Sequence, residues 1–252
     1  MSDCQPRTNN GKPPQSTTGL ASPACNQLLI EGNHVHHCRD GIWSWHTNVD
    51  QVSVERAEIR GNLSEQTLVN GIFSYRYARG VVMRHNSARN SGETLIGMMR
   101  GAVDSMISDN VAMCGGWYAE TMQYPGPSAI NVHTVGTGNI VERNFAAFQQ
   151  DASLRDGNGI IVDFTKYPVQ VRNNIVYRNQ GSGITITESA GGFVLNNTAG
   201  ENGVGAADPV NGAGLRIFGA ASVDSVVSSN LLQMNANAGL FLNSAGNLKQ
   251  KY

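Results

Sequence analysis

Charge, cysteine, lysine and long apolar runs are all scarce in this sequence. Only 15% of its 252 residues are charged and the formal net charge is −1, so the chain lacks the Lys/Arg excess that binds nucleic acid or an anionic membrane. No apolar run approaches the ~20 residues that cross a bilayer. We therefore expect neither partner, while a hydrophobic fraction of 40% is enough for one substantial core.

The four cysteines, Cys4, Cys25, Cys38 and Cys114, are too few and too scattered for a disulfide framework, and no CxxC pair indicates a zinc site. Cys25 and Cys38 could bridge in an oxidising compartment, although the pattern favours buried thiols. No cluster of Asp ligands indicates a calcium site. We expect no bound metal and no required cofactor, with calcium left open.

The two ends of the chain differ from its middle. Residues 1–24 are polar and lack the charged and then apolar regions of an export signal, so we interpret them as a leader or the edge of a fragment. Residues 244–252 form a C-terminal tail. The region 25–243 is rich in Gly and Asn, and the whole chain holds 29 Gly and 26 Asn. Both are turn residues, which indicates a fold of many short elements.

The asparagines reveal an internal repeat. One column places apolar residues three positions before and two positions after each member, and its members are Asn33, Ala57, Asn86, Asn110, Asn144, Asn174, Asn197 and Asn230. An inward Asn at a turn tolerates left-handed backbone and can bond the equivalent Asn one coil away. A second, partial column consists of Asn62, Asn179, Asn202 and Asn235.

A second signal follows each member of the column: a small residue, an aliphatic residue and then alternating polarity. The pairs are Gly41-Ile42, Gly71-Ile72, Leu95-Ile96, Ala129-Ile130, Gly159-Ile160, Gly183-Ile184, Gly214-Leu215 and Gly239-Leu240. This is the pattern of a strand with one buried face. About eight coils of stacked parallel strands, joined by loops of variable length, explain the irregular spacing. A leucine-rich repeat needs denser Leu, and a left-handed hexapeptide helix needs spacings in multiples of six.

Three segments carry a family resemblance: Asp156–Asp163 (DGNGIIVD), Val171–Asn179 (VRNNIVYRN) and Phe193–Asn197 (FVLNN). With them, residues 25–243 resemble the right-handed parallel β-helix superfamily, the pectate-lyase-like fold, and within it the bacterial right-handed β-helix region proteins. The resemblance implies an all-β, right-handed parallel β-helix solenoid of about eight coils. It also implies action on acidic polysaccharides outside the cell or at its surface, although no export signal is present. The motifs are specific for fold and weak for function.

If these strands stack in register, the residues beside the buried aliphatics point outward and form one continuous surface. We call this surface the wall, and its successive strands lie about 4.8 Å apart. Its middle is polar and its N-terminal end aromatic, which suits a carbohydrate groove. We predict that His133 and Asp163 are neighbours there, so that the carboxylate orients the imidazole as a base. Arg100 would neutralise a uronate carboxylate, and Tyr75 or Lys166 would supply the acid of a β-elimination.

The substrate contacts that we predict on this wall and in the long loop before His133 are Trp43, Trp45, Tyr75, Asn131, Arg216, Trp117, Tyr118 and Tyr124. A hydrolase would instead use Asp163 and Glu188 as acid and base. The plainer interpretations are that His133 and Asp163 are a surface cross-strand pair and that the aromatic end is a subunit contact or a missing coil. His34 and His36, with Glu58 as third ligand, suggest a metal site, but a solvated strand face explains them better.

Two classes of function follow. The first is a polysaccharide lyase-like enzyme acting on a uronate-containing polysaccharide. The second is a non-catalytic glycan-binding or structural solenoid, such as a tailspike or adhesin module. We expect a monomer or a homotrimer with a polysaccharide partner.

Overall fold

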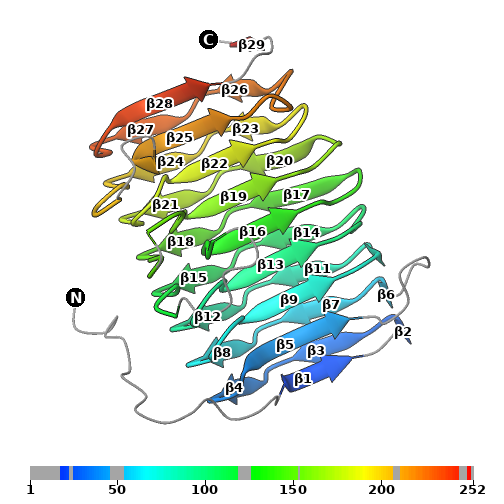
Figure 1. The fold of residues 1–252 in the computed structure, drawn as a ribbon. Helices are drawn as coiled ribbons and strands as arrows, with labels where there is room; N and C mark the ends of the chain where they lie inside the picture. The colour runs from blue at the N-terminus through cyan, green and yellow to red at the C-terminus, as the bar shows by residue number, and fades with distance from the viewer. Residues whose placement is uncertain are drawn as a thin grey trace.

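The computed structural model describes residues 18–22, 25–45, 54–118, 126–152, 154–206, 211–243 and 249–250 (Figure 1). They form a right-handed parallel β-helix, as the repeat and the resemblance predict. Each full coil runs through three strands, one in each of three long parallel sheets. Among the described residues, no helix is long and apolar enough to span a membrane.

Sheet 1 faces the viewer in Figure 1 and holds nine strands in the order of the stack. They are β1 (Thr18–Ser22), β5 (Asp40–Trp45), β9 (Ile72–Tyr75), β13 (Ile96–Met99), β16 (Ile130–His133), β19 (Ile160–Asp163), β22 (Ile184–Thr187), β25 (Ala213–Phe218) and β28 (Ala238–Asn243). The first of them lies within residues 1–24 and pairs with β5.

Sheet 2 also has nine strands: β3 (Leu29–Glu31), β7 (Glu58–Arg60), β11 (Val82–Arg84), β14 (Met106–Ser108), β17 (Asn139–Glu142), β20 (Val169–Arg172), β23 (Phe193–Leu195), β26 (Val226–Ser228) and β29 (Lys249–Gln250). Sheet 3 has eight: β4 (His34–His36), β8 (Leu63–Glu65), β12 (Ser87–Arg89), β15 (Val111–Met113), β18 (Phe145–Ala147), β21 (Ile175–Tyr177), β24 (Thr198–Gly200) and β27 (Leu231–Gln233). A short sheet joins β2 (Cys25–Asn26), β6 (Val54–Glu55) and β10 (Ala78–Arg79).

Corners between the sheets are made by single residues with left-handed backbone. In the corner from sheet 2 to sheet 3 these residues are Gly32, Gly61, His85, Asp109, Arg143, Asn173, Asn196 and Ser229. Each stands one position before an Asn that points into the solenoid, so the left-handed residue is the neighbour of that Asn and not the Asn itself. After five strands of sheet 1 the first residue also has left-handed backbone, and Tyr77 and Gly101 continue it in two of them; these first residues are Arg76, Arg100, Thr134, Phe164 and Glu188.

The Asn ladder exists, with one correction. Asn62 hydrogen-bonds both Asn33 and Asn86, so Asn62 occupies the place that the sequence pattern gave to Ala57. Ile59 pairs with Ile30 and Met83, which shifts this one coil by five residues. The error arose because Val54, Ala57 and Ile59 repeat the apolar spacing of the true column. The second ladder joins Asn179, Asn202 and Asn235.

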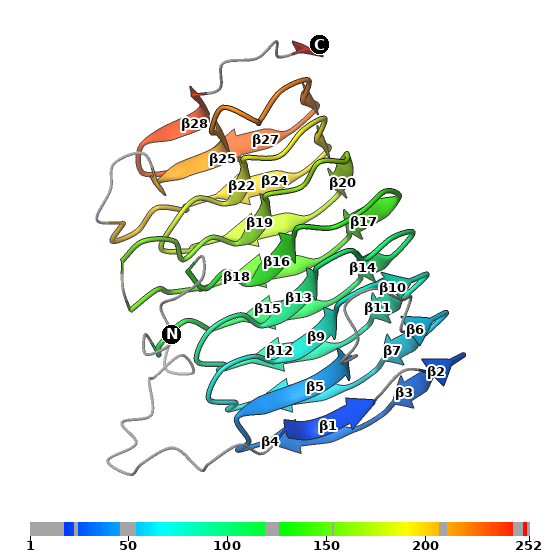
Figure 2. The same cartoon turned by 45° about the vertical axis from the view of Figure 1, so that its right-hand side comes forward.

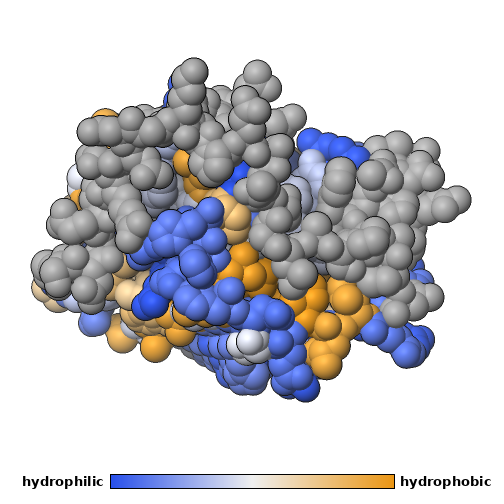
Figure 3. Space-filling view, turned by 90° about the horizontal axis from the view of Figure 1, so that it is seen from below, coloured by the Kyte–Doolittle hydropathy of each residue, from blue (hydrophilic) through white to orange (hydrophobic). Residues whose placement is uncertain are grey.

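Inward aliphatic side chains fill the solenoid. Stacked examples are Ile42, Ile72, Ile96, Ile130, Ile160, Ile184 and Leu215, all with exposed fractions of 0%. Cys38 is also buried, whereas Cys114 takes part in a disulfide bond, which the sequence pattern did not predict. Figure 3 looks at the end of the stack that carries β3 and β4 and shows apolar residues in its centre with hydrophilic ones beside them.

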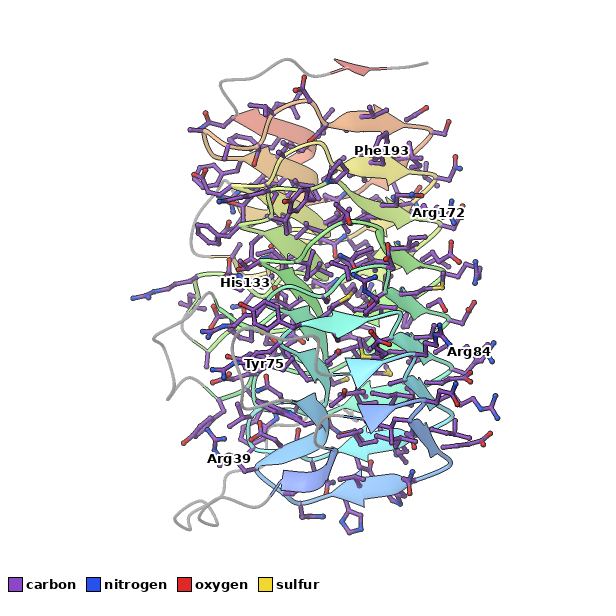
Figure 4. All side chains as sticks on the ribbon, turned by 90° about the vertical axis from the view of Figure 1, so that its right-hand side faces the viewer. Arg39, Tyr75, Arg84, His133, Arg172 and Phe193 are labelled. Carbon is purple, nitrogen blue, oxygen red and sulfur yellow. The ribbon has the colours of Figure 1, made fainter. Side chains whose placement is uncertain are left out.

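Sheet 2 presents charged pairs on its outer face. Arg84 pairs with Glu58, and Arg172 with Glu142, across adjacent strands. Figure 4 shows Arg84 and Arg172 on the side of the molecule opposite His133 and Tyr75. In the second pair, Arg172 Nε donates a hydrogen bond of 2.7 Å to the buried carboxylate of Glu142. The polar wall of sheet 1 is therefore a separate face.

Candidate active-site groove

The outward face of sheet 1 has the register that the sequence predicts. His133 pairs with Asp163 on the next strand and with Met99 on the previous one. Asn131 lies opposite Gly97 and Ile161 in the same way. The two outward columns therefore stack strand by strand, about 4.8 Å apart.

The inner of these columns is not the open surface that the sequence suggested. Phe73, Asn131, Ile161 and Thr185 are only 1–2% exposed. Connections between sheets 3 and 1 fold over them; for example, the side chain of Asn158 accepts a hydrogen bond from Thr185 Oγ1 at 3.0 Å. The long coils supply the extra residues that make this cover. The outward face of sheet 1 is therefore the floor of a groove, and the connections between sheets 3 and 1 form one side of that groove.

A first cavity of about 350 Å³ lies over β5, β9, β13 and β16. Its lining combines aromatic rings, two arginines and a few polar groups: Trp43, Asn70, Phe73, Tyr75, Arg76, Glu93, Thr94, Met99, Arg100, Asn131 and His133. Five of these residues were predicted from the sequence as site residues. The structure brings them into one cavity of the size and character of a small-ligand site.

His133 lies at the C-terminal end of this cavity beside a buried carboxylate. Its Nδ1 is 3.0 Å from Asp163 Oδ2, and the Asp163 side chain is 0% exposed. The two atoms are within hydrogen-bonding distance, but neither makes a hydrogen bond of good geometry with any described residue. Such a bond can tighten when a ligand binds. Because of the burial of Asp163, the pair is not a mere surface cross-strand contact.

Aromatic rings and guanidinium groups form the opposite end of the cavity. The rings of Trp43 and Tyr75 are stacked with centroids 5.7 Å apart. The guanidinium carbons of Arg76 and Arg100 each lie 5.3 Å from the centroid of the Tyr75 ring. This is a cation–π distance, and it holds two positive charges at the groove edge.

Glu93, which was not predicted as a site residue, precedes β13 and lines the first cavity. Burial, reinforced by the nearby charge of Asp40, raises the pKa of Glu93 to about 7. Asp40 is itself buried, and burial raises its pKa although Arg39 opposes the shift. Glu93 can therefore hold or release a proton near neutral pH, as a group in an acid–base site must.

A second cavity of about 460 Å³ continues the groove over β19, β22 and β25. It is lined by Leu154, Arg155, Asp156, Ile161, Thr185, Thr187, Asn211, Arg216 and Phe218. The guanidinium of Arg216 lies 4.5 Å from the Phe218 ring centroid and also bonds Asn211. Burial and the charge of Asp151 raise the pKa of Asp156 to about 6. Asp156, like Glu93, was missed by the sequence analysis.

The remaining predicted site residues lie away from the two cavities or outside the described residues. Lys166 is exposed beyond the end of β19, and the Glu188 carboxylate accepts a hydrogen bond from the Ala221 backbone at 3.0 Å. Trp117 donates to the Asn90 carbonyl, and its ring packs edge-on against Tyr118. The side chain of Trp45 and all of Tyr124 are outside the described residues.

The histidines near the N-terminus lie at the edge of sheet 3. His34 Nε2 is 2.7 Å from Glu65 Oε1, and not near Glu58, because the corrected register places Glu58 on sheet 2. Within the described part of the chain, no group of three or more His, Cys, Asp or Glu side chains is arranged to hold a metal ion.

Solved structures with the same fold include carbohydrate enzymes. The A-module of mannuronan C-5 epimerase AlgE6 from Azotobacter vinelandii is 15% identical, with 90% of this chain and 65% of that chain covered and a TM-score of 0.55. The AlgE4 A-module from the same organism is 14% identical, with 92% and 74% covered and a TM-score of 0.51. The Agl-KA catalytic domain is 10% identical, with 90% of this chain and 47% of that chain covered and a TM-score of 0.54. At these identities the likeness shows the fold alone, and the chain spans only part of each neighbour.

No curated protein sequence matches the chain. The profile of a β-helix family does match it, over residues 116–250, which is more than half of its length. That segment contains β16 to β29 and every residue that lines the second cavity. The chain belongs to the family described as "Periplasmic copper-binding protein (NosD)".

Proposed function

We propose that this chain is a carbohydrate-active β-helix protein that removes the C5 proton of a uronate residue in an acidic polysaccharide, with β-elimination as the outcome. The observation that carries the proposal is the His133–Asp163 pair at the end of a cavity that also holds Arg76, Arg100 and Tyr75. A base, positive charge and an aromatic platform meet in one place. These are the groups that the chemistry of uronate elimination needs.

The aromatic end of the first cavity suits a sugar ring. Trp43 and Tyr75 present near-parallel rings, with an angle of 29° between their planes. The faces of such rings pack against the apolar faces of sugars, while polar groups fix the orientation of the hydroxyls. Asn131 provides such a group, because its Oδ1 is buried without a hydrogen-bond partner in the described residues. A bound sugar hydroxyl would satisfy it.

Positive charge next to this platform favours a uronate over a neutral sugar. Arg76 and Arg100 line the first cavity together. Guanidinium groups bind carboxylates through paired, charge-assisted hydrogen bonds. Neutralising the uronate carboxylate makes the C5 proton more acidic and stabilises the charge that develops when the proton leaves.

His133 is the base in this scheme. Asp163 next to Nδ1 favours the tautomer with the proton on that nitrogen, which leaves Nε2 with a lone pair. Nε2 takes the C5 proton, the C–H electrons form the C4=C5 double bond, and the C4–O bond breaks. The carboxylate of Asp163 stabilises the imidazolium that results.

The copper in the family description does not fit the residues present. In residues 116–250, where the family profile matches, His133 is the only histidine and there is no cysteine. Those are the side chains that copper prefers. Met234 is exposed, and His133 Nδ1 already faces Asp163. We derive no step through copper, and calcium stays a possible addition to be tested by chelation.

The family description and Cys114 support a location outside the cytoplasm. The family is described as periplasmic, and disulfides such as that of Cys114 persist mainly in oxidising compartments. We propose the periplasm or the cell exterior, testable by fractionation of the native cells. We also propose a monomer or homotrimer, which light scattering distinguishes.

The test uses pectate, alginate and hyaluronate, with the purified chain in deuterated buffer. NMR follows the loss of the C5 proton signal, and ultraviolet absorbance follows the unsaturated product. We expect both signals with at least one polymer. We expect His133→Asn to lower the rate of both about 100-fold or more, as loss of a general base does. His85→Asn is the control, because His85 is exposed on a sheet corner.

The possible results separate the alternatives. Binding to a polymer without exchange or cleavage would contradict the enzymatic proposal and favour a glycan-binding module. Exchange with inversion at C5 but no double bond would identify an epimerase, the activity named for two of the fold neighbours. New reducing ends without absorbance would indicate a hydrolase. Unchanged activity of His133→Asn would remove His133 from the mechanism.

A further inference from the structure

We infer that Asp156 is the proton donor of the proposed elimination and that the second cavity holds the sugar unit that leaves. The inference rests on the proposed function, since a donor has meaning only if a C4–O bond breaks. Neither Tyr75 nor Lys166, the acids that the sequence suggested, lines that second cavity. Tyr75 lines the first cavity, and Lys166 is exposed and lines neither.

The position of Asp156 follows from the order of the strands. The first cavity ends at His133 on β16, and the second begins at Ile161 on the adjacent strand β19, two residues before Asp163. Asp156 lines this second cavity, and the charge of Asp163 contributes to raising its pKa. A polysaccharide that runs along the groove would therefore meet the base on one side of the pair and Asp156 on the other.

The loop holds Asp156 firmly over the sheet. The Oδ2 atom of buried Asp151 accepts hydrogen bonds from the backbone N–H groups of Arg155 and Asp156, at 2.9 and 2.8 Å. Asn158 Nδ2 lies 3.3 Å from Asp156 Oδ1, and Thr185 on β22 bonds the same Asn158. A side chain at Gly126 would collide with Asp156, because an added Cβ would lie 2.9 Å from Oδ2. This carboxyl group is preorganised, as a catalytic group should be.

The surroundings of Asp156 keep its carboxyl group protonated at a higher pH than an ordinary Asp. Burial and the negative charges of Asp151 and Asp163 raise its pKa to about 6, while Arg155 and Arg216 are the cations that line the same cavity. Below that pH the carboxyl group carries the proton that a departing C4 oxygen needs. After cleavage Asp156 is ionised and His133 is protonated, and exchange with water restores both.

The rest of the second cavity suits a sugar. Arg216 can face the carboxylate of a second uronate, and its guanidinium carbon lies 4.5 Å from the centroid of the Phe218 ring. Thr185 and Thr187 add hydroxyl groups on the floor. Taken together, the linings of the two cavities include residues from seven consecutive strands of sheet 1, β5 to β25. That is a run of about 30 Å at the usual strand spacing.

The test compares Asp156→Asn with Asp224→Asn, an exposed control residue. If Asp156 is the donor, Asp156→Asn lowers the rate of formation of unsaturated product about 100-fold or more, and C5 exchange with deuterated solvent stays within about threefold of wild type. A uronide with fluoride at C4 needs no proton to release its leaving group. Elimination of that substrate should therefore be nearly normal in Asp156→Asn.

Three results would overturn the inference. They are product formation by Asp156→Asn within threefold of wild type, equal loss of exchange and cleavage with an unchanged circular dichroism spectrum, and failure of the fluoride substrate to restore elimination. In wild type, cleavage by the donor should also fall as the pH rises through about 6. Absence of both exchange and cleavage in wild type would instead contradict the proposed function itself. Separate measurement of exchange and cleavage keeps these two failures distinct.

Discussion

Two regions of the solenoid bury polar side chains in opposite ways. At the corner between sheets 2 and 3, each internal ladder Asn is both donor and acceptor; Asn144 bonds Asn110, Asn174 and the Ile107 carbonyl. On the floor of the groove, Asn131 Oδ1, Trp43 Nε1 and Asp163 Oδ1 are buried without hydrogen-bond partners in the described residues. The same coil geometry produces both regions.

This difference in pairing indicates that the ladder asparagines stabilise the fold and that the groove residues are available to a ligand. Buried polar groups are normally paired, and a repeated Asn achieves this because each coil presents its partner at the next. The groove residues also repeat strand by strand, but their partners change from coil to coil, so that their polar atoms stay available. A ligand with many hydroxyls and carboxylates is the natural partner for such a surface.

The largest effect on stability should come from the ladder. Asn144→Ala removes two hydrogen bonds donated by Nδ2 and two accepted by Oδ1, and it leaves their buried partners unpaired. We expect a loss of about 3–5 kcal/mol in the free energy of unfolding, from about 1 kcal/mol per bond and the added desolvation. Urea denaturation measures it. Asn243→Ala, at an exposed position, should change the same quantity little, and an equal loss there would contradict the special role of the ladder.

A change of intermediate size and opposite sign in the free energy of unfolding should come from the replacement of Glu93. Its pKa is about 7 in the folded chain, against an ordinary value of 4.5. Because the folded pKa is raised, the protonated carboxyl is favoured, and this stabilisation is complete below pH 4.5 and lost as the pH rises through 7. Each unit of difference between the pKa in the folded chain and in the unfolded chain corresponds to about 1.4 kcal/mol in the free energy of unfolding. Partial solvent access to Glu93 reduces this contribution.

We therefore expect Glu93→Gln to increase the free energy of unfolding by about 2 kcal/mol relative to wild type at pH 8 and to change it little at pH 5. Melting temperatures at the two pH values test this. Glu201→Gln is the contrast, because hydrogen bonds from Tyr177 and Arg178 lower the pKa of Glu201. That variant should gain nothing at pH 8. A Glu93→Gln variant less stable than wild type at pH 8 would show that the carboxylate is paired.

The sequence predicts the ladder better than the groove, for a physical reason. The ladder needs the same residue in every coil, so it appears as a column, and only the coil around Ala57 was misplaced because its apolar spacing imitates the true one. The predicted pairing of His133 with Asp163 is confirmed by the strand register, since it depends on strand counting alone.

Glu93 and Asp156 escaped the sequence analysis because their properties come from burial by loops. A loop has no period, so the residues that surround these carboxyl groups do not recur from coil to coil. One signal was available: both stand three or four residues before a buried Ile that begins a strand of sheet 1, Ile96 and Ile160. An acidic residue at that point enters the covered side of the groove.

The smallest effect on stability should come from Asn131, which is the same residue type as Asn144 and equally buried at 2% exposure. Because its Oδ1 has no hydrogen-bond partner in the described residues, Asn131→Ala removes no bond to that atom and relieves its desolvation. We expect the free energy of unfolding to change by less than about 1 kcal/mol. The affinity for the proposed polysaccharide ligand should fall about five- to tenfold, since one hydrogen bond to that ligand would be lost. Calorimetric titration and urea denaturation of the same preparation measure the two quantities. A large loss of stability with unchanged affinity would mean that Asn131 belongs with the ladder asparagines and that the groove floor is structural.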